Sequence, residues 1–371
     1  MKYFFFLILK KFILYGKLDI EIGNDPVKSI VGQLDGPNIH IQILNLKHLF
    51  LIVRSPELSF GELYMNKELK IKKGNLEDLM KFLMLNYNSW QSTNFGKIRK
   101  YLNDLKNFFS TFNPIKKAKR NAAHHYDLND DLFESFLDKR RQYSCGFFYS
   151  KNESLEDAQI NKVSRLVAKL QINKGNTVLD IGCGWGGLGL SIYNCNPSTR
   201  ITGITLSEKQ HIYFNQLIKK NKLTGKVECL LKDYRELDNE YDRIVSVGML
   251  EHVGHHNFEK FFQFIENHLK PKGVAVIHSI GRYGLPAHTN PWLEKYIFPG
   301  GYLPTFSQMT HAIEKTSLKI TDIEVMRLHY AETLKKWREK FFKNKSFLPK
   351  TYDEKFYRMW EFYLLASEYF F

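Results

Sequence analysis

Apolar and polar residues follow two different rhythms along this chain of 371 residues. Over residues 18–60 they alternate in short bursts, KLDIEI, IHIQILNL and LFLIV, which predict β-strands. Residues 75–87, NLEDLMKFLMLNY, instead repeat their apolar residues at helical spacing. Together these patterns predict a small α+β domain over about residues 1–95.

A second rhythm begins near residue 174, where short apolar runs alternate with amphipathic stretches. The runs predict buried strands over residues 176–182, 201–207, 227–233, 241–249 and 273–281. Helices are predicted between them, over residues 188–194, 208–221 and 258–270. This alternation is typical of an α/β domain whose parallel sheet is covered on both faces, here over residues 121–371. Ligands of such sheets bind at the carboxyl ends of the strands.

The first residues, MKYFFFLILKKFILYG, form an apolar run that Lys10 and Lys11 interrupt. A membrane-spanning helix needs about 20 apolar residues, which is more than this run offers. No small-residue cleavage site of a signal peptide follows. The run therefore predicts a helix that either packs on its own domain or lies in a membrane surface, and we favour packing.

The charge balance changes this picture by pointing to an anionic partner. The net charge is +15, which favours a nucleic acid or an anionic membrane surface. Residues 97–120 hold eight Lys or Arg and one acidic residue, so residues 96–120 are interpreted as a basic linker, either a solvated connector or a contact for lipid phosphates. The four cysteines are dispersed without a C-x-x-C pair, which favours a reducing, cytoplasmic compartment.

The strongest local signal is VLDIGCGWGGL at residues 178–188, where an acidic residue and four glycines follow a predicted strand. Its G-x-G-x-G spacing differs from the G-x-G-x-x-G of dinucleotide sites. It resembles motif I of class I S-adenosylmethionine-dependent methyltransferases, which implies S-adenosylmethionine as the cofactor and a Rossmann-like sheet. The acidic residue that such enzymes place after the second strand is replaced by Thr205, Ser207 and Gln210, whose neutral groups also bind hydroxyls.

A narrower resemblance emerges when further stretches are combined: HHYDLNDDLFESFLD (124–138), YSCGFF (143–148), TLSEKQ (205–210), DRIVSVGMLEHVG (242–254), HSIGR (278–282) and HYAETLKKW (329–337). With the glycine loop, this set is similar to the cyclopropane-fatty-acyl-phospholipid synthases and the related mycolic acid cyclopropane synthases, over residues 120–366. The stretch LSFGELYMNKEL (58–69) resembles the segment that precedes the catalytic domain in the bacterial phospholipid enzymes, which favours a phospholipid substrate.

This resemblance implies that a methylene unit passes from S-adenosylmethionine to a cis double bond of an unsaturated phospholipid, through a carbocation that bound bicarbonate deprotonates. Bicarbonate would be held by five residues: Cys145, Glu251, His278, Ile280 and Tyr330. The cofactor would contact residues of the glycine loop and of the neighbouring strand ends: Tyr143, Ser144, Asp180, Gly182, Cys183, Gly184, Trp185, Gly186, Gly187, Thr205, Leu206, Ser207, Gln210, Asp233, Tyr234 and Gly248.

Alternatives remain open at this level. A related enzyme would end with a methyl-branched or methylene chain, and a relative that only binds lipid would not react at all. A nucleic-acid methyltransferase is disfavoured because GMLEHVG replaces the N-P-P-Y or D-P-P-Y tetrad after the fourth strand. No metal site is predicted, since the histidines of EHVGHH lack the spacing of a ligand set. The expected partner is an unsaturated phospholipid in the inner membrane surface, and a homodimer stays open.

Two departures from the family pattern concern the C-terminal region. Ser367 stands where family members carry a cysteine once regarded as catalytic. The chain also reaches Phe371 inside a predicted helix, without the final strand of the family's sheet order 3-2-1-4-5-7-6. An interior strand that is missing would leave backbone groups unpaired, so stability is expected to suffer.

Overall fold

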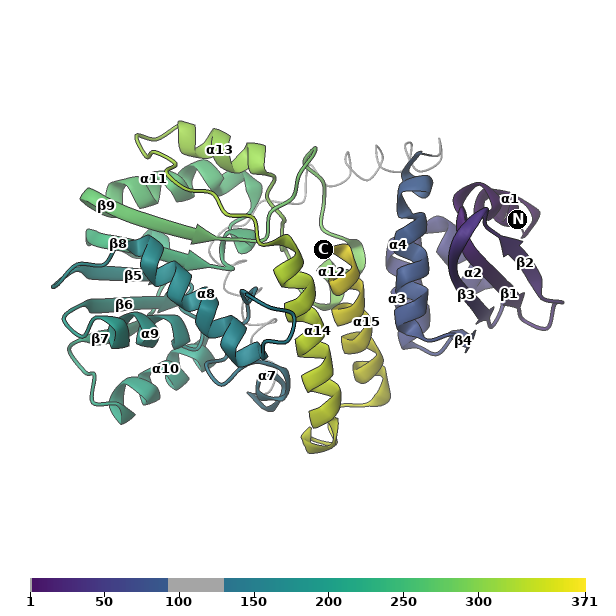
Figure 1. The fold of residues 1–371 in the computed structure, drawn as a ribbon, viewed down its shortest axis with the longest axis horizontal. Coiled ribbons are helices and arrows are strands. Elements are labelled where there is room, and N and C mark those ends of the chain that lie inside the picture. The colour runs from purple at the N-terminus through teal and green to yellow at the C-terminus, as the bar shows by residue number, and fades with distance from the viewer. Residues whose placement is uncertain (1, 93–129) are drawn as a thin grey trace.

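A computed structural model describes residues 2–92 and 130–371 of the chain, which form an N-terminal domain and a larger α/β domain (Figure 1). The predicted basic linker, residues 96–120, lies outside the described residues, as do residues 124–129 of the HHYDLNDDLFESFLD stretch. Within the described ranges, no helix is both long enough and apolar enough to cross a bilayer.

The N-terminal domain is a four-stranded sheet packed against helices. Its strands lie in the order β2-β1-β3-β4, with β1 and β3 parallel and the outer pairs antiparallel. Every second residue of β1 is buried, as the alternation predicts. The elements are α1 (Lys2–Phe12), β1 (Tyr15–Ile22), β2 (Lys28–Val31), β3 (Leu34–Ile43), α2 (Leu46–Arg54), α3 (Pro56–Met65), β4 (Leu69–Lys73) and α4 (Leu76–Ser92).

The first helix, α1, packs on its own domain, which confirms the favoured expectation. Phe5 is buried in the domain core and Phe6 packs against that core. The opposite face of α1 points outward, with Tyr3 77% and Phe4 56% exposed. The helix is therefore apolar on both faces although one of them is uncovered, which is unusual for a surface helix.

The strand predicted from LFLIV is wrong, because these residues lie in α2. A five-residue apolar run fits a strand and a helix face equally well. The neighbouring residues decide: the side chain of Asn45 accepts a hydrogen bond from the backbone N–H of His48 (3.2 Å), which caps the helix. Pro56 then begins α3 in the first-turn position that proline favours.

The second domain is built around a parallel five-stranded sheet in the order β7-β6-β5-β8-β9. All five strands and the three helices between them occur where the sequence predicts them. The elements are α7 (Asp130–Phe136), α8 (Leu155–Leu170), β5 (Thr177–Ile181), α9 (Gly187–Cys195), β6 (Arg200–Thr205), α10 (Glu208–Lys220), β7 (Val227–Leu231), β8 (Tyr241–Val247), α11 (Phe258–His268), β9 (Leu269–His278), α12 (Pro291–Tyr296), α13 (Phe306–Glu314), α14 (Arg327–Asn344) and α15 (Glu354–Phe370).

The two faces of this sheet carry separate apolar cores. One core joins the sheet to α8, α9 and α10, and the other joins it to α11 and α13. The chain runs outward from β5 through β6 to β7 and then returns to β8 on the other side. The strand order therefore reverses beside β5, and a ligand site is expected at the carboxyl ends of β5 and β8.

The β9 strand forms one edge of the sheet, where the family order would place a further strand. In the described part of the chain, residues 318–326 follow α13 without forming a strand. Ile320, Ile323 and Val325 of this segment are 45%, 55% and 59% exposed. The segment is held from α8 instead, through ion pairs of Arg165 and Lys169 with Asp322 and Glu324.

The two domains meet along α3 and α4 on one side and α12 with α15 on the other (Figure 1). A Cβ added to Gly61 would lie 2.5 Å from Nε1 of Trp292, so glycine lets the two helices approach closely. The Tyr64 hydroxyl donates to Glu361 (2.8 Å), and Arg358 donates to the Tyr64 carbonyl (2.7 Å). The N-terminal domain is thereby packed against α12 and α15 of the larger domain.

Candidate active site

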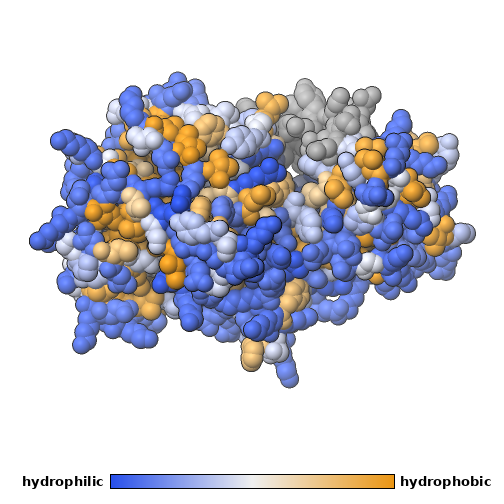
Figure 2. All heavy atoms as spheres, in the orientation of Figure 1, coloured by the Kyte–Doolittle hydropathy of each residue, from blue (hydrophilic) through white to orange (hydrophobic). Residues whose placement is uncertain are grey.

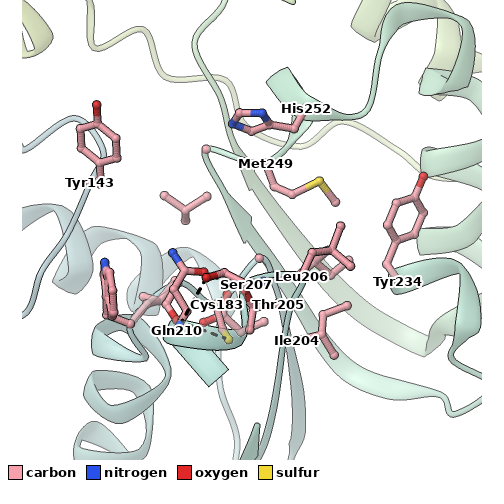
Figure 3. Close-up of a pocket in the computed structure, with 18 of the residues that line it drawn as sticks. Tyr143, Cys183, Ile204, Thr205, Leu206, Ser207, Gln210, Tyr234, Met249 and His252 are labelled. Carbon is pink, nitrogen blue, oxygen red and sulfur yellow. Dashed lines mark hydrogen bonds between the residues drawn. The ribbon is translucent and has the colours of Figure 1, made fainter. Parts of the chain in front are cut away.

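A pocket opens at the carboxyl ends of β5, β6 and β8, where the reversal of strand order predicts it. We call it the central pocket. Figure 3 shows Tyr143, His252 and Tyr234 around this pocket, across from Thr205, Ser207 and Gln210. Fourteen of the residues predicted to contact the cofactor line it: Tyr143, Ser144, Asp180, Gly182, Cys183, Gly184, Trp185, Thr205, Leu206, Ser207, Gln210, Asp233, Tyr234 and Gly248.

The remaining two predicted residues, Gly186 and Gly187, are not among the lining residues, and they shape the loop from behind. Gly186 has a φ of +83°, and a Cβ there would lie 2.1 Å from the ring of Phe214. A Cβ on Gly187 would lie 2.4 Å from the carbonyl oxygen of Arg140. Both positions therefore require glycine for packing of the loop.

Asp180 is the penultimate residue of β5 and carries a fully buried carboxyl, 1% exposed. Burial raises its pKa to about 7, although the nearby positive charge of Lys162 acts in the opposite direction. Its Oδ2 atom has no hydrogen-bond partner among the described residues. A buried polar atom left without a partner at a pocket wall is a position where a ligand donor would be accommodated.

The TLSEKQ stretch forms the turn between β6 and α10. Ser207 caps α10 by accepting from the N–H of Gln210 (3.4 Å), and Thr205 donates to Oε1 of Gln210 (2.7 Å). Because Oε1 is engaged in this way, the amide nitrogen of Gln210 is the group left to donate elsewhere. Asp233, by contrast, is paired in bidentate fashion with Arg235 at 2.7 Å and caps a short helical turn, so its carboxylate is largely occupied.

The pocket also has lining residues that the sequence did not single out. Gln142 and Met249 stand next to predicted positions, whereas Pro299 and Gly300 come from the loop after α12. His252 lines the pocket as well, and burial lowers the pKa of its imidazole to about 4, so it is neutral at pH 7. Two polar residues of α8, Gln159 and Lys162, hydrogen-bond Ser144 and Gln142 in the pocket wall. They interrupt an otherwise apolar helix face, which is a signal that the sequence offers for such a contact.

The five residues predicted to hold bicarbonate, Cys145, Glu251, His278, Ile280 and Tyr330, are called the predicted base site. None of the five is among the described residues that line the central pocket. The site adjoins it, however, because Ser144 and Gly248 line the pocket and Gly248 donates its N–H to the carbonyl of His278 (2.9 Å). The pocket and the predicted base site are thus neighbours where β8 and β9 end.

Glu251 is buried, 7% exposed, and is hydrogen-bonded to one other member of the predicted base site. Its Oε1 accepts from the backbone N–H of Ile280 (2.6 Å), and Oε2 has no hydrogen-bond partner within the described ranges. Burial raises the pKa of Glu251 to about 7, and the Ile280 N–H partly opposes this rise. A carboxyl with such a pKa changes its protonation state near neutral pH, which suits a proton-transfer site.

The other three members lie on separate elements, and the hydrogen bond between Glu251 and Ile280 is the contact that the structure gives between members of the predicted base site in its described residues. His278 ends β9, and burial together with the charge of Lys162 lowers its pKa to about 4. Cys145 is 4% exposed, and burial raises the pKa of its thiol to about 12, so it is not a reactive thiolate. Tyr330 lies on α14, with its ring 4.7 Å from that of Phe371 and 6.0 Å from that of Trp337. In the described part of the chain, no cluster of three or more His, Cys, Asp or Glu side chains is suited to hold a metal ion.

This combination of sheet and site defines a class of protein. A parallel sheet with the order β7-β6-β5-β8-β9, whose first strand carries an acidic residue near its end and leads into a glycine loop, is a class I methyltransferase fold. The family model for mycolic acid cyclopropane synthetase matches residues 114–371, and the chain belongs to this family. The resemblance drawn from the sequence motifs is thereby confirmed.

Two curated relatives are each 38% identical to the chain. One is the cyclopropane-fatty-acyl-phospholipid synthase of Escherichia coli, aligned over 252 residues that cover 68% of this chain and 64% of that protein. The other is the tuberculostearic acid methyltransferase UfaA1 of Mycobacterium tuberculosis, aligned over 265 residues that cover 68% of this chain and 62% of that protein. The match therefore spans less than two thirds of either relative's own length.

Solved structures of the family agree with the fold. The cyclopropane synthase MmaA2 of Mycobacterium tuberculosis superimposes with a TM-score of 0.64 at 31% identity, covering 69% of this chain and 93% of that one. The mycolic acid cyclopropane synthase CmaA1, solved with SAH and CTAB, gives a TM-score of 0.63 at 30% identity over the same shares.

Proposed function

We propose that this chain uses S-adenosylmethionine to convert the cis double bonds of unsaturated acyl chains in membrane phospholipids into cyclopropane rings. The observation that carries the proposal is the placement of a buried carboxyl of raised pKa, Glu251, beside a glycine-loop pocket of the methyltransferase type. The relatives named for the same chemistry on fatty acyl chains support the choice of substrate.

The residues of the central pocket fit S-adenosylmethionine, which supplies an electrophilic methyl group when bound. The unpartnered Oδ2 of Asp180 offers an acceptor, and the amide nitrogen of Gln210 offers a donor for ribose hydroxyls. A Cβ added to Gly184 would meet no atom within 4 Å, so the backbone of the loop faces open space there. The pocket walls are therefore able to hold the cofactor without rearrangement of the loop.

Bicarbonate is the base that the family resemblance implies, and the predicted base site offers a matching set of groups. The tyrosine hydroxyl, the histidine ring and backbone N–H groups are donors to an anion. Glu251 would accept the bicarbonate hydrogen through Oε2, which has no partner among residues 2–92 and 130–371. In this role Glu251 must be ionised, so its raised pKa places the onset of activity near pH 7.

An aromatic cluster lies where an acyl chain would approach the cofactor. The Tyr143 ring lines the central pocket and is 5.1 Å from the ring of Trp337 and 6.4 Å from that of Phe298. Its hydroxyl is 2.8 Å from that of Tyr363 on α15. Addition of a methyl group to a double bond leaves a positive charge on the chain, and aromatic faces stabilise such a charge.

The outward face of α1 is proposed as the membrane contact of this enzyme. Tyr3, Phe4 and Leu7 are exposed there, and Lys10 and Lys11 follow at the end of the helix. Aromatic and aliphatic side chains next to lysines suit the boundary between acyl chains and anionic head groups. Figure 2 shows apolar side chains among polar ones over the N-terminal part of the molecule.

The proposal is tested by methyl transfer from labelled S-adenosylmethionine to vesicles of unsaturated phosphatidylglycerol, with vesicles of saturated chains as the control. Cyclopropane products gain the mass of one methylene and show ring protons by NMR, whereas a methyl-branched product gives a different NMR pattern. Lipids recovered without any added mass, from protein that binds SAH normally, would refute the proposed reaction.

The membrane contact is tested separately by sedimentation with vesicles. Anionic vesicles should bind the chain more tightly than neutral ones, and Phe4→Ser with Leu7→Ser should weaken binding to both. Val325→Ser, which removes an exposed apolar side chain at a distance from α1, is the matched control. Equal binding of all variants would exclude α1 as the contact.

A further inference from the structure

Helix α8 holds the segment 142–147 through a series of polar contacts. This segment carries lining residues of the central pocket, Gln142 to Ser144, and one member of the predicted base site, Cys145. Gln159 donates to the carbonyl of Ser144 (2.8 Å), and Phe147 donates its N–H to the carbonyl of Ala158 (2.8 Å). Lys162 donates to Oε1 of Gln142 (2.5 Å) and to the hydroxyl of Ser144 (3.1 Å). Both Gln142 and Ser144 line the central pocket, so these contacts fix part of its wall.

Lys162 is an unusual residue to find in this place, because it is only 1% exposed. A buried ammonium group costs free energy unless hydrogen bonds and charge compensate for its lost hydration. Burial lowers the pKa of Lys162 to about 8, and the negative charges of Asp138 and Asp180 act in the opposite direction. A methionine would fill the same apolar space without that cost, so the amine has a function that packing does not supply.

The contact with Lys162 determines how the side-chain amide of Gln142 is oriented. An ammonium group has only donors, so it must be met by the amide oxygen of Gln142. The amide nitrogen then points the other way, toward the glycine loop, where a Cβ added to Gly187 would lie 2.6 Å from it. A donor group is thereby held at the first residue of α9, beside the N–H groups that open this helix.

We propose that Gln142 donates a hydrogen bond from Nε2 to the carboxylate of the methionine part of the cofactor, and that Lys162 is the positioning residue that keeps this amide turned toward it. The inference rests on the proposed use of S-adenosylmethionine. It assigns a cofactor contact and a support for it to two residues outside the glycine loop. Ser144, held by the same lysine, lies at the side of the pocket that faces Cys145.

The decisive variant is Gln142→Glu, which is nearly isosteric. Its carboxylate still accepts from Lys162, so the fold is kept, but it carries no donor for the ligand. Binding is measured by calorimetry with SAH and with the decarboxylated analogue, in which hydrogen replaces the carboxylate. SAH should bind about 10- to 100-fold more weakly to the variant, the range of a lost charge-assisted hydrogen bond. The analogue should change by less than about threefold.

A second pair of variants tests the positioning role of Lys162. Lys162→Met should weaken SAH binding about 10-fold, and the double variant with Gln142→Glu should be no weaker than Gln142→Glu alone, because the two residues act as one unit. Lys169→Met removes a half-buried lysine of the same helix, which is paired with Asp322 and Glu324 and does not line the central pocket, and should leave binding unchanged. Thermal melting checks that each variant is folded. If Lys162→Met does not fold, the contact of Gln142 with the cofactor carboxylate is tested by Gln142→Glu alone.

The outcomes separate this inference from the proposed function. If the unaltered chain fails to bind SAH, the proposed use of S-adenosylmethionine fails. If it binds SAH and Gln142→Glu binds SAH equally well, only the present inference is overturned. An equal loss of affinity for SAH and for the decarboxylated analogue would also overturn it, because the residue would then act on the pocket as a whole.

Discussion

The central pocket and the predicted base site are neighbours, yet they are built in different ways. The pocket is defined mainly by backbone, through glycines of positive φ and capped turns that lie within a few short stretches of sequence. The predicted base site depends on side chains from β9, α14 and the loop after β8, and burial shifts the pKa values of two of them, Glu251 and His278. We therefore expect that the central pocket is disrupted by substitutions that change the shape of its backbone, and that the predicted base site is disrupted by substitutions that remove an ionisable group.

The largest expected effect comes from removing charge at the predicted base site. Glu251→Gln keeps the size of the side chain and its bond to the Ile280 N–H, but it cannot ionise. Methyl transfer to unsaturated vesicles should fall about 10²- to 10⁴-fold, the range of a lost proton-transfer group. SAH affinity, measured by calorimetry, should stay the same, because Glu251 does not line the central pocket.

The matched control for this variant is Glu259→Gln, which removes an exposed carboxylate at the start of α11. It should leave the methyl-transfer rate unchanged. Full activity of Glu251→Gln would show that the predicted base site is assigned to the wrong carboxyl. A combined loss of activity and SAH affinity would instead mean that the two sites are not separable.

The second largest effect is expected from a substitution that distorts the glycine loop of the central pocket. Gly186→Ala places a methyl group 2.1 Å from the ring of Phe214 at a φ of +83°, so both strain and overlap are expected. Urea denaturation should show a loss of about 2–4 kcal/mol in the free energy of unfolding. Gly225→Ala has the same kind of φ, +82°, but no atom within 4 Å of the added Cβ.

Gly225→Ala therefore isolates the cost of the backbone conformation, which should be about 1 kcal/mol. The difference between the two variants is the cost of the overlap with Phe214. Equal losses would mean that the loop moves freely around Gly186, and the description of the pocket as a rigid backbone structure would be wrong.

The third prediction concerns pH and Glu251. Its pKa is raised from 4.5 to about 7 by burial, so the folded state holds a proton that the unfolded state has released between these values. The contribution of Glu251 to stability is therefore lost as pH rises from about 4.5 to 7. The free energy of unfolding of the unaltered chain, minus that of Glu251→Gln, should fall by up to about 3 kcal/mol over this window.

Activity should change in the opposite direction, because the ionised form of Glu251 is the one that would accept the hydrogen of bicarbonate. The rate of methyl transfer should rise across the same window with an apparent pKa near 7. Taking the difference from Glu251→Gln cancels the contributions of the buried histidines, which gain stability as pH rises. A difference that is flat with pH would show that Glu251 is not buried in the way the structure describes.

The same contrast explains how far sequence reasoning could reach. The glycine loop and its cap residues were predictable because their geometry is set by neighbours in sequence, such as Thr205 and Gln210. The LFLIV run was assigned to a strand because a short apolar run fits either structure, and only its flanking Asn45 favoured a helix. The role of Gln142 was not visible, because it depends on a lysine 20 residues away in sequence.

One signal for that support was present in the sequence. Gln159 and Lys162 lie on the same helix face as Val163, Leu166 and Leu170, all of which are buried. Polar residues within an apolar helix face are expected to have buried partners. The pKa of Glu251 gave no such signal, because burial by residues from several elements cannot be read from a motif.

The smallest effect is expected at Cys145, which lies at the boundary between the two sites. Its thiol donates to the carbonyl of Gly146 (3.2 Å). Burial raises its pKa to about 12, although a side-chain hydrogen bond with Thr333 opposes this rise, so neither nucleophilic attack nor charge is available from it. Cys145→Ser keeps the size and the donor, and methyl transfer should stay within about threefold of the unaltered rate. Cys145→Phe should abolish activity, since the residue is 4% exposed and the larger ring would displace the segment that α8 holds. A complete loss of activity in Cys145→Ser, with SAH affinity retained, would show that the thiol itself takes part in the reaction. The predicted base site would then act by nucleophilic catalysis and not through the charge of Glu251 alone.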